Sequence, residues 1–261
     1  MTRFASLLYG AAAYGASLVT VLYAIGFVAN SGVPKGIDEG AVVPLPEALV
    51  VNTLLLALFA VQHSVMARPG FKAWWTKVVP EPIERSTFVA FASVSLMLLF
   101  WQWRPMPAML WSIENSTAAA VVQGLSLAGW GIVLLSTFLI SHFELFGLTQ
   151  VVRNWLGRST PEPVFHTPMF YKHVRHPLYF GFLIAFWAAP TMTAGHLFFA
   201  VVTTAYILIA IQLEERDLVA VFGARYIEYR ERVAMIIPGL RFGRGAGANQ
   251  RLAPMPSASD R

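Results

Sequence analysis

The 261-residue sequence contains no cysteine and few charged residues. The absence of cysteine excludes disulfide bonds, thiolate metal sites, iron–sulfur clusters and a cysteine nucleophile. Charged residues make up 13% of the chain, against roughly 25% in typical soluble domains, whereas 56% of the residues are hydrophobic. Because so little of the chain suits a water-facing surface, the composition indicates a membrane protein.

Common cofactor and metal signatures are missing as well. The sequence has no HExxH pair, no P-loop and no Rossmann glycine fingerprint. His173 and His176 are three residues apart, but Pro177 follows directly and disfavours a helical ligand pair. We therefore expect no metal site, and any nucleotide-like cofactor must be bound outside a Rossmann or P-loop site.

Long apolar runs predict the membrane spans. About 20 residues are needed for a helix to cross, and the runs cover 4–29, 47–66, 87–103, 118–141 and 178–213. As one helix the last run would be about 54 Å long, whereas the hydrocarbon core is about 30 Å thick, so this run must fold back on itself. Pro190 and Gly195 favour a turn around 190–195. The sequence predicts an all-α polytopic transmembrane bundle of five or six spans, forming one membrane-embedded domain over 1–238 with a cytoplasmic C-terminal helical segment. The Arg-, Gly- and Pro-containing stretch 242–261 is predicted to be a disordered tail.

The basic residues predict the orientation. Of the 19 Lys and Arg residues, 17 fall before the first span, in 67–86, in 142–177 and from 214 onward, all of which lie on one side of the membrane in this layout. By the positive-inside rule that side is cytoplasmic. We expect an integral protein of a bacterial inner membrane with both termini in the cytoplasm. Topology accounts for the net charge of +5, so no nucleic-acid partner is expected.

Polar residues near the span ends are the candidates for chemistry, because ionisable groups at membrane depth are costly. A hairpin that turns near residue 193 places His176 and Glu214 at similar heights. Arg175 and the imidazoles beside it could bind a carboxylate, while Glu214 and Glu215 could accept hydroxyl groups or bind a cation. This combination suits a zwitterionic cofactor that carries a ribose.

The same segments carry a family resemblance. RHPLYFG at 175–181, EER at 214–216 and FGARYIEYRERVAMIIP at 222–238 resemble the integral-membrane methyltransferases of the isoprenylcysteine and phospholipid methyltransferase superfamily. Further strings resemble the methanethiol S-methyltransferase branch, which is related to NnrU-type proteins: QHSVMAR at 62–68, ERSTF at 84–88, WQWRP at 101–105 and HFELFGLTQV at 142–151. The resemblance extends over most of residues 50–238.

The resemblance implies a cofactor, a reaction and site residues. The cofactor is S-adenosyl-L-methionine, and its binding residues are expected to be Tyr171, His173, Arg175, His176, Tyr179, Gly181, Glu214, Glu215, Tyr226 and Tyr229. The implied reaction is in-line, metal-independent methyl transfer to methanethiol, a small volatile thiol, giving dimethyl sulfide. An imidazole near the thiol would favour the thiolate. The first candidate for this base is His142, oriented by Glu144, and the second is His63.

Other interpretations stay open from the sequence. A lipid or prenyl-cysteine methyltransferase would use the same cofactor site with a lipid acceptor. A non-catalytic membrane protein, such as an NnrU-like accessory factor or a transporter, is the alternative from a different class. His63 could simply hydrogen-bond a neighbouring helix, and His142 with Glu144 could be an interfacial cap. Glu214 and Glu215 could be solvated residues at a span end. Arg68, Lys72 and Lys77 with Trp74 and Trp75 indicate contact with membrane lipid headgroups. The sequence does not indicate an oligomeric state.

Overall fold

The computed structural model describes residues 2–159 and 164–240 of the chain, so the predicted tail at 242–261 lies outside the described residues. Long helices that are apolar enough to cross a membrane are α1 (Arg3–Ala29), α2 (Leu45–Ala67), α4 (Glu81–Gln102), α5 (Ser116–Ile140) and α9 (Ala194–Phe222). The described strands, β1 (Met109–Ser112) and β2 (Thr191–Thr193), form one small antiparallel sheet. The predicted all-α membrane bundle is therefore confirmed, and the protein is an integral membrane protein.

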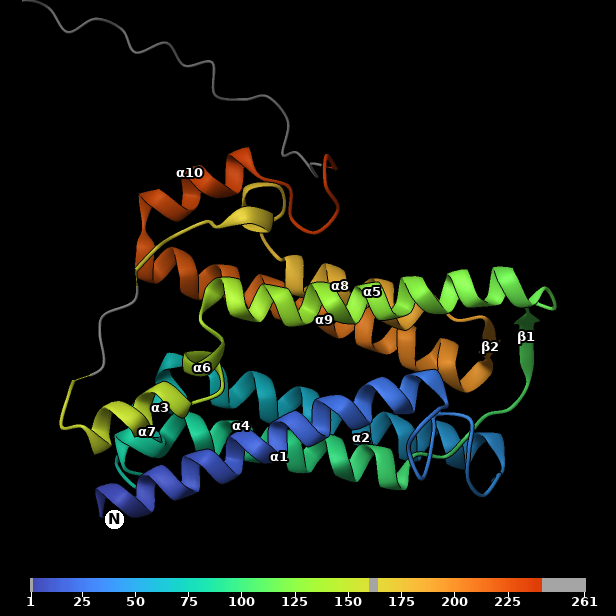
Figure 1. Cartoon of the computed structure of the whole chain (residues 1–261), viewed down its shortest axis with the longest axis horizontal. Coiled ribbons are helices and arrows are strands. Elements are labelled where there is room, and N and C mark those ends of the chain that lie inside the picture. The colour runs from blue at the N-terminus through green and yellow to red at the C-terminus, as the bar shows by residue number, and fades with distance from the viewer. Residues whose placement is uncertain (1, 160–163, 241–261) are drawn as a thin grey trace, which may run out of the picture.

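Short helices gather at one end of the bundle. They are α3 (Pro69–Trp75), α6 (His142–Leu145), α7 (Leu148–Trp155), the 3₁₀ turn η1 (Met169–Lys172) and α10 (Ala224–Arg232). Figure 1 shows α3, α6, α7 and α10 at the end where the N-terminus lies, opposite β1 and β2. We call this the site end of the bundle.

Helix α4 begins earlier than the sequence predicts. The apolar run starts at Thr87, but the helix begins at Glu81 and includes the charged residues of its first turns. Arg85 is accommodated there because its Nε donates a hydrogen bond to the Leu145 carbonyl oxygen at 2.7 Å and its guanidinium lies 4.7 Å from the centre of the Phe88 ring. These tertiary contacts leave no trace in hydropathy.

The predicted hairpin consists of a short helix and a long one. Helix α8 (Pro177–Trp187) has 11 residues, about 16 Å, which is half of a 30 Å hydrocarbon core. Non-helical residues continue the path, and β2 pairs with β1 through Ser112↔Thr191 and Trp111↔Met192. The Thr193 side chain then caps α9 by accepting a hydrogen bond from the His196 backbone N–H at 3.1 Å. The turn therefore ends at Thr193, and α9 begins one residue before Gly195.

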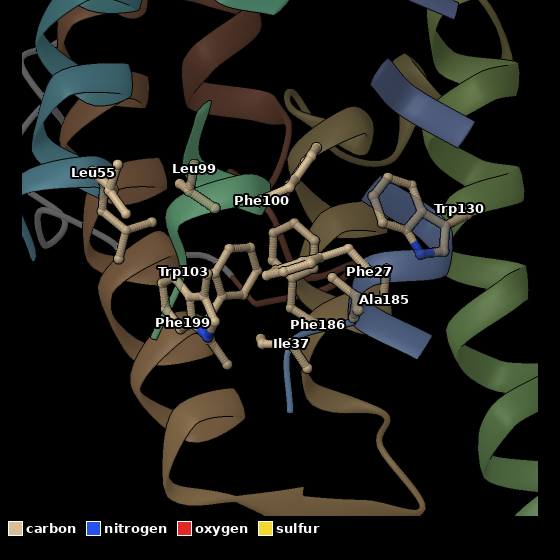
Figure 2. Packing of buried hydrophobic residues seen from close by; sticks show 13 residues of the cluster. Phe27, Ile37, Leu55, Leu99, Phe100, Trp103, Trp130, Ala185, Phe186 and Phe199 are labelled. Carbon is tan, nitrogen blue, oxygen red and sulfur yellow. The ribbon is translucent and has the colours of Figure 1, made fainter. Parts of the chain in front are cut away.

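An aromatic core joins the two groups of helices visible in Figure 1. Figure 2 shows Phe27 of α1, Trp103 after α4, and Phe186 and Phe199 of the hairpin packed together. Phe27 and Trp103 meet edge to face with ring centroids 6.1 Å apart, and Phe186 and Phe199 do so at 5.1 Å. Since lipid is as apolar as these side chains, close packing rather than water exclusion holds the groups together.

Glycines let α5 and α8 approach closely. A Cβ atom added to Gly181 would lie 2.7 Å from the Gly129 carbonyl oxygen, and one added to Gly129 would lie 2.7 Å from the Gly181 carbonyl oxygen. Small residues at such crossings allow backbone contact between membrane helices. Gly181 is four residues after Pro177, so this contact lies in the second turn of α8.

Candidate active site

The start of α8 is held in place by the segment that follows α10. Val174 forms a parallel bridge with Ala234, and both residues are buried. The Arg175 N–H donates to the Ala234 carbonyl oxygen at 2.8 Å, and the His176 N–H donates to the Met235 carbonyl oxygen at 3.1 Å. Two neighbouring polar side chains are thereby positioned at the base of the hairpin, beside the end of α9.

Glu215 is locked inside this cluster. Its Oε1 accepts hydrogen bonds from Arg175 Nε at 2.7 Å and from His176 Nε2 at 3.0 Å. Because a carboxylate only accepts, the His176 proton lies on Nε2. The Glu215 and Arg175 side chains are only 7% and 10% exposed, so the pair is buried and charge-assisted. Arg230 is farther away, with its Nη1 4.0 Å from Glu215 Oε2.

Glu214 is the accessible carboxylate of the cluster. Its side chain is 43% exposed, and Oε2 accepts a hydrogen bond from the Tyr179 hydroxyl at 3.0 Å. Among the described residues, the nearest titratable nitrogen is His176 Nδ1, 3.9 Å from Oε2. Arg175 is committed to Glu215, so the negative charge of Glu214 has no strong cationic partner in the described part of the chain.

Tyrosines line another side of the cluster. The Tyr229 hydroxyl donates to the Tyr171 carbonyl oxygen at 2.6 Å, and Tyr226 is buried beside it with ring centroids 5.8 Å apart. Burial raises the pKa of Tyr171, and Glu214 adds to the effect. Burial also raises the pKa of Tyr226 and Tyr229. All three phenols stay neutral, so they can donate hydrogen bonds across physiological pH.

A cavity of about 270 Å³ opens next to Tyr229. Phe165, Thr167 and Glu228 contribute to its lining, and the Phe165 ring lies 5.4 Å from that of Tyr229. Its volume is near the lower end of the roughly 300–1,000 Å³ typical of small-molecule sites. A larger cavity of about 380 Å³ lies at the opposite end of the bundle, where its polar lining is uncharged and includes Asn30, Gln123 and Thr191. The smaller cavity has Arg225, Glu228 and Arg232 in its lining and shares Tyr229 with the cluster described above.

Two of the expected cofactor residues lie apart from these contacts. His173 is exposed at the end of η1. Gly181 is buried against α5, where the helix crossing by itself accounts for glycine. The remaining expected residues meet around Glu214 and Glu215, and their role in binding stays a prediction.

His142 is joined to the helices around it rather than to Glu144. Its Nδ1 lies 2.8 Å from the Thr137 hydroxyl and its Nε2 lies 2.9 Å from the Tyr14 hydroxyl. Since the Thr137 hydroxyl donates its proton to the Leu134 carbonyl oxygen, it accepts from His142 Nδ1–H, and the Tyr14 hydroxyl donates to Nε2. Burial lowers the pKa of His142, which favours this neutral form.

His63 is in a different situation. It packs between aromatic rings, with its centroid 5.2 Å from Phe59 and 4.9 Å from Phe88. Its Nδ1 is buried and has no hydrogen-bond partner within the described residues. The two histidines considered as bases thus differ: one has both nitrogens bonded, and the other has a nitrogen free.

Several residues that form contacts around the candidate site were not identified from the sequence. Tyr14 and Tyr206 are tyrosines placed in apolar runs, which is the signal that could have identified them. The Tyr206 hydroxyl pairs with the Ser64 hydroxyl at 3.2 Å, and Arg68 forms an ion pair with Asp217 at 2.8 Å. The first contact joins α2 to α9, and the second joins Arg68, the residue after α2, to α9. No cluster of three or more His, Cys, Asp or Glu residues suited to a metal is found in 2–159 or 164–240.

Relatives of known name cover most of the chain. It is 57% identical to methanethiol S-methyltransferase 1 of Bradyrhizobium diazoefficiens over 92% of this chain and 84% of the relative. It is 52% identical to methanethiol S-methyltransferase of Mycobacterium tuberculosis over 91% of this chain and 98% of the relative. Nurim of Sus scrofa is 30% identical over 69% of this chain and 70% of its own length. No family model and no solved structure matches the chain. With identities of this size over nearly full-length alignments, the chain belongs to the methanethiol S-methyltransferase family.

Proposed function

We propose that this protein transfers a methyl group from S-adenosyl-L-methionine to methanethiol, releasing dimethyl sulfide and S-adenosylhomocysteine. The identity to methanethiol S-methyltransferases over most of both chains supports the acceptor. The observation that supports the donor is the accessible Glu214 carboxylate, which has no strong cationic partner among the described residues. Such a group favours a cationic ligand, and the donor carries both a sulfonium and an ammonium charge.

The residues at the site end fit the parts of such a donor. Glu214 would bind the ammonium group, and the neutral hydroxyls of Tyr171 and Tyr226 would donate hydrogen bonds to oxygens of the methyl donor. The aromatic rings of Phe165 and Tyr229 in the 270 Å³ cavity would stack on the adenine, and the Glu228 carboxylate would accept hydrogen bonds from the ribose hydroxyls. Glu215 would act indirectly, by holding Arg175 and His176 in position.

When bound, the donor supplies a methyl group already activated by the positive sulfur. The chain must then align the thiol with that methyl group and exclude water, and positioning alone can supply roughly 7–11 kcal/mol of the barrier. A small apolar thiol is soluble in lipid, so the apolar outer surfaces of the long helices allow it to approach from the membrane. Orientation in a bacterial inner membrane, with both termini in the cytoplasm, is supported by the basic residues at the site end.

Headspace gas chromatography tests the proposal. Membranes containing the protein are given methanethiol and S-adenosyl-L-methionine with a deuterated methyl group, and we expect deuterated dimethyl sulfide. Membranes from cells with an empty vector serve as the blank. Dimethyl sulfide at the blank level would refute the acceptor, and methylated lipid in its place would favour the lipid alternative.

Isothermal titration with S-adenosylhomocysteine tests the donor site separately. Glu214→Gln should weaken binding about tenfold or more, since a hydrogen bond to a charged group contributes about 1.5–3 kcal/mol. Glu114→Gln, at an exposed position at the other end of the bundle, is the matched control and should bind like the wild type. Equal affinity for all three proteins would remove Glu214 from the donor site.

A further inference from the structure

The geometry points to His63 as the group that accepts the thiol proton, in an acceptor site formed by α2, α4 and α9. This inference rests on the proposed methyl transfer and assigns the acceptor site, which the comparisons leave open. We call Phe59, His63, Phe88 and Tyr206 the acceptor cluster. Its members come from three helices, and their rings lie close to one another. The Phe59 ring centroid is 5.2 Å from that of His63 and 6.1 Å from that of Tyr206, and the His63 and Phe88 ring centroids are 4.9 Å apart.

The first argument is the unmet hydrogen-bonding capacity of His63. Buried polar atoms in native proteins nearly always have partners, and an exception calls for an explanation such as a catalytic role or a bound molecule. Nδ1 of His63 is such an exception within the described residues. His142 has both nitrogens bonded, and His176 donates Nε2–H to Glu215. A thiol beside His63 would supply the missing partner.

The second argument is the chemical character of the surroundings. The rings of Phe59 and Phe88 on either side of His63 offer an apolar seat, and sulfur makes favourable contacts with aromatic rings. Methanethiol has one carbon and one sulfur, so it needs little space and no charged partner. The Arg85 guanidinium, 4.7 Å from the centre of the Phe88 ring, is a positive charge near His63 and disfavours a second one, so His63 is a neutral imidazole that can act as a general base.

The third argument is the position of the acceptor cluster relative to the donor site. On α9, Tyr206 and Asp217 both face α2, since their partners are Ser64 and Arg68. Ile207, Ile211 and Glu215 instead pack toward α8 and the segment after α10. At 100° per residue, Glu214 lies between these two faces. A donor bound at Glu214 and a thiol beside His63 therefore approach from adjoining sides of α9.

The proposed step balances without another reactant. The thiol proton moves to His63 Nδ1, the thiolate sulfur forms a bond to the donor methyl carbon, and the carbon–sulfonium bond breaks with its electron pair going to the donor sulfur. The sulfonium becomes a neutral thioether. His63 then releases the proton to water as the products leave.

The pH profile of His63→Asn is the main test. In the wild type, kcat/KM for methanethiol should level off above the pKa of the imidazole. In the variant it should be lower by about 100-fold at neutral pH, as typical for loss of a general base. It should then rise about tenfold per pH unit up to the ionisation of methanethiol, because only free thiolate reacts. Affinity for S-adenosylhomocysteine should stay within twofold of the wild type.

Gln62→Met is the matched control. Gln62 also has a buried oxygen without a partner in the described residues, but it points about 100° away around α2. We expect this variant to keep the wild-type pH profile. If His63→Asn also keeps it in an active protein, the inference is overturned. If both variants lose the plateau, the effect is not specific to His63 and the inference is likewise overturned.

Two further measurements do not depend on the His63 rate. Phe59→Ala enlarges the acceptor cluster at a half-buried position, so the ratio of kcat/KM for ethanethiol to that for methanethiol should rise about tenfold; an unchanged ratio contradicts the location of the site. In protein labelled on histidine, the ring signal that His63→Asn removes should shift when methanethiol is added with S-adenosylhomocysteine present. Without such a shift the inference fails, whereas absence of dimethyl sulfide from the wild type would refute the proposed function alone.

Discussion

Glu214 and Glu215 are adjacent in sequence, yet the structure predicts different effects when each is replaced by glutamine: a lower Tm for Glu215→Gln and a lower ligand affinity for Glu214→Gln. The Glu215 side chain is 7% exposed and accepts hydrogen bonds from Arg175 and His176. Glu215→Gln would leave the Arg175 guanidinium, itself 10% exposed, without its carboxylate. Removing one partner of a buried ion pair costs about 3–5 kcal/mol. Since glutamine keeps one oxygen in place, we expect a loss near the lower end, about 3 kcal/mol.

Glu214→Gln should behave differently because its carboxylate is 43% exposed and accepts one hydrogen bond from Tyr179. A hydrogen bond to a charged group contributes about 1.5–3 kcal/mol, but glutamine keeps an oxygen that can accept from Tyr179 and solvent screens the exposed charge, so the loss should be about 1 kcal/mol or less. For a protein of this size, 1 kcal/mol corresponds to a change in Tm of roughly 2–4 °C. We therefore expect Tm to fall by roughly 6–12 °C for Glu215→Gln and by no more than about 4 °C for Glu214→Gln.

The assay is thermal unfolding in detergent, followed by fluorescence of the eight tryptophans, together with titration of S-adenosylhomocysteine well below the lowest Tm. Glu215→Gln should mainly lower Tm, and Glu214→Gln should mainly lower affinity. Equal decreases in Tm would refute the assignment of one carboxylate to structure and the other to ligand. So would a Glu215→Gln protein whose Tm lies within 2 °C of the wild type.

Three other variants test separate contacts. Gly181→Ala places a Cβ 2.7 Å from the Gly129 carbonyl oxygen and should lower the free energy of unfolding by about 1–3 kcal/mol, measured as a lower Tm. Gly124→Ala, with open space around it, is the control and should leave Tm unchanged. The wild type should lose stability as pH falls from 7 to 5, because burial lowers the folded-state pKa of His142 and the unfolded chain then binds more protons than the folded protein. His142→Gln should show a smaller loss of Tm over the same pH range. An identical pH dependence of Tm in the two proteins would contradict this. Tyr229→Phe removes the hydrogen bond to the Tyr171 carbonyl oxygen and should weaken S-adenosylhomocysteine binding several-fold in titration; unchanged affinity would show that this tyrosine does not order the site.

The long helices could be predicted because hydropathy reports lipid exposure directly. The start of α4 could not be predicted, because the charged Arg85 is accommodated in this helix by its hydrogen bond to the Leu145 carbonyl oxygen and its contact with Phe88. The short length of α8, 11 residues, could not be predicted either. An apolar run of 36 residues indicates that a turn exists, but the pairing of β2 with β1 decides where the helix stops.

The donor side of the site was more accessible to sequence reasoning than the acceptor side. His176 and Glu215 lie at matching distances from the turn, so the hairpin alone brings them together. His142 and His63 both end apolar runs and look equivalent in sequence. Only their neighbours distinguish them: Tyr14 and Thr137 bond both nitrogens of His142, while the Nδ1 of His63 has no partner in the described residues.

The bridge between Val174 and Ala234 also bears on the order of biosynthesis. The long helices can leave the translocon one after another, but the backbone groups of Arg175 and His176 find their partners only when residues 234 and 235 emerge from the ribosome. The site end is therefore completed last, after the long helices are in the lipid. A nascent chain that stops after α9 would be inserted but would lack the segment that positions Arg175 and His176, and we expect such a chain to be inactive.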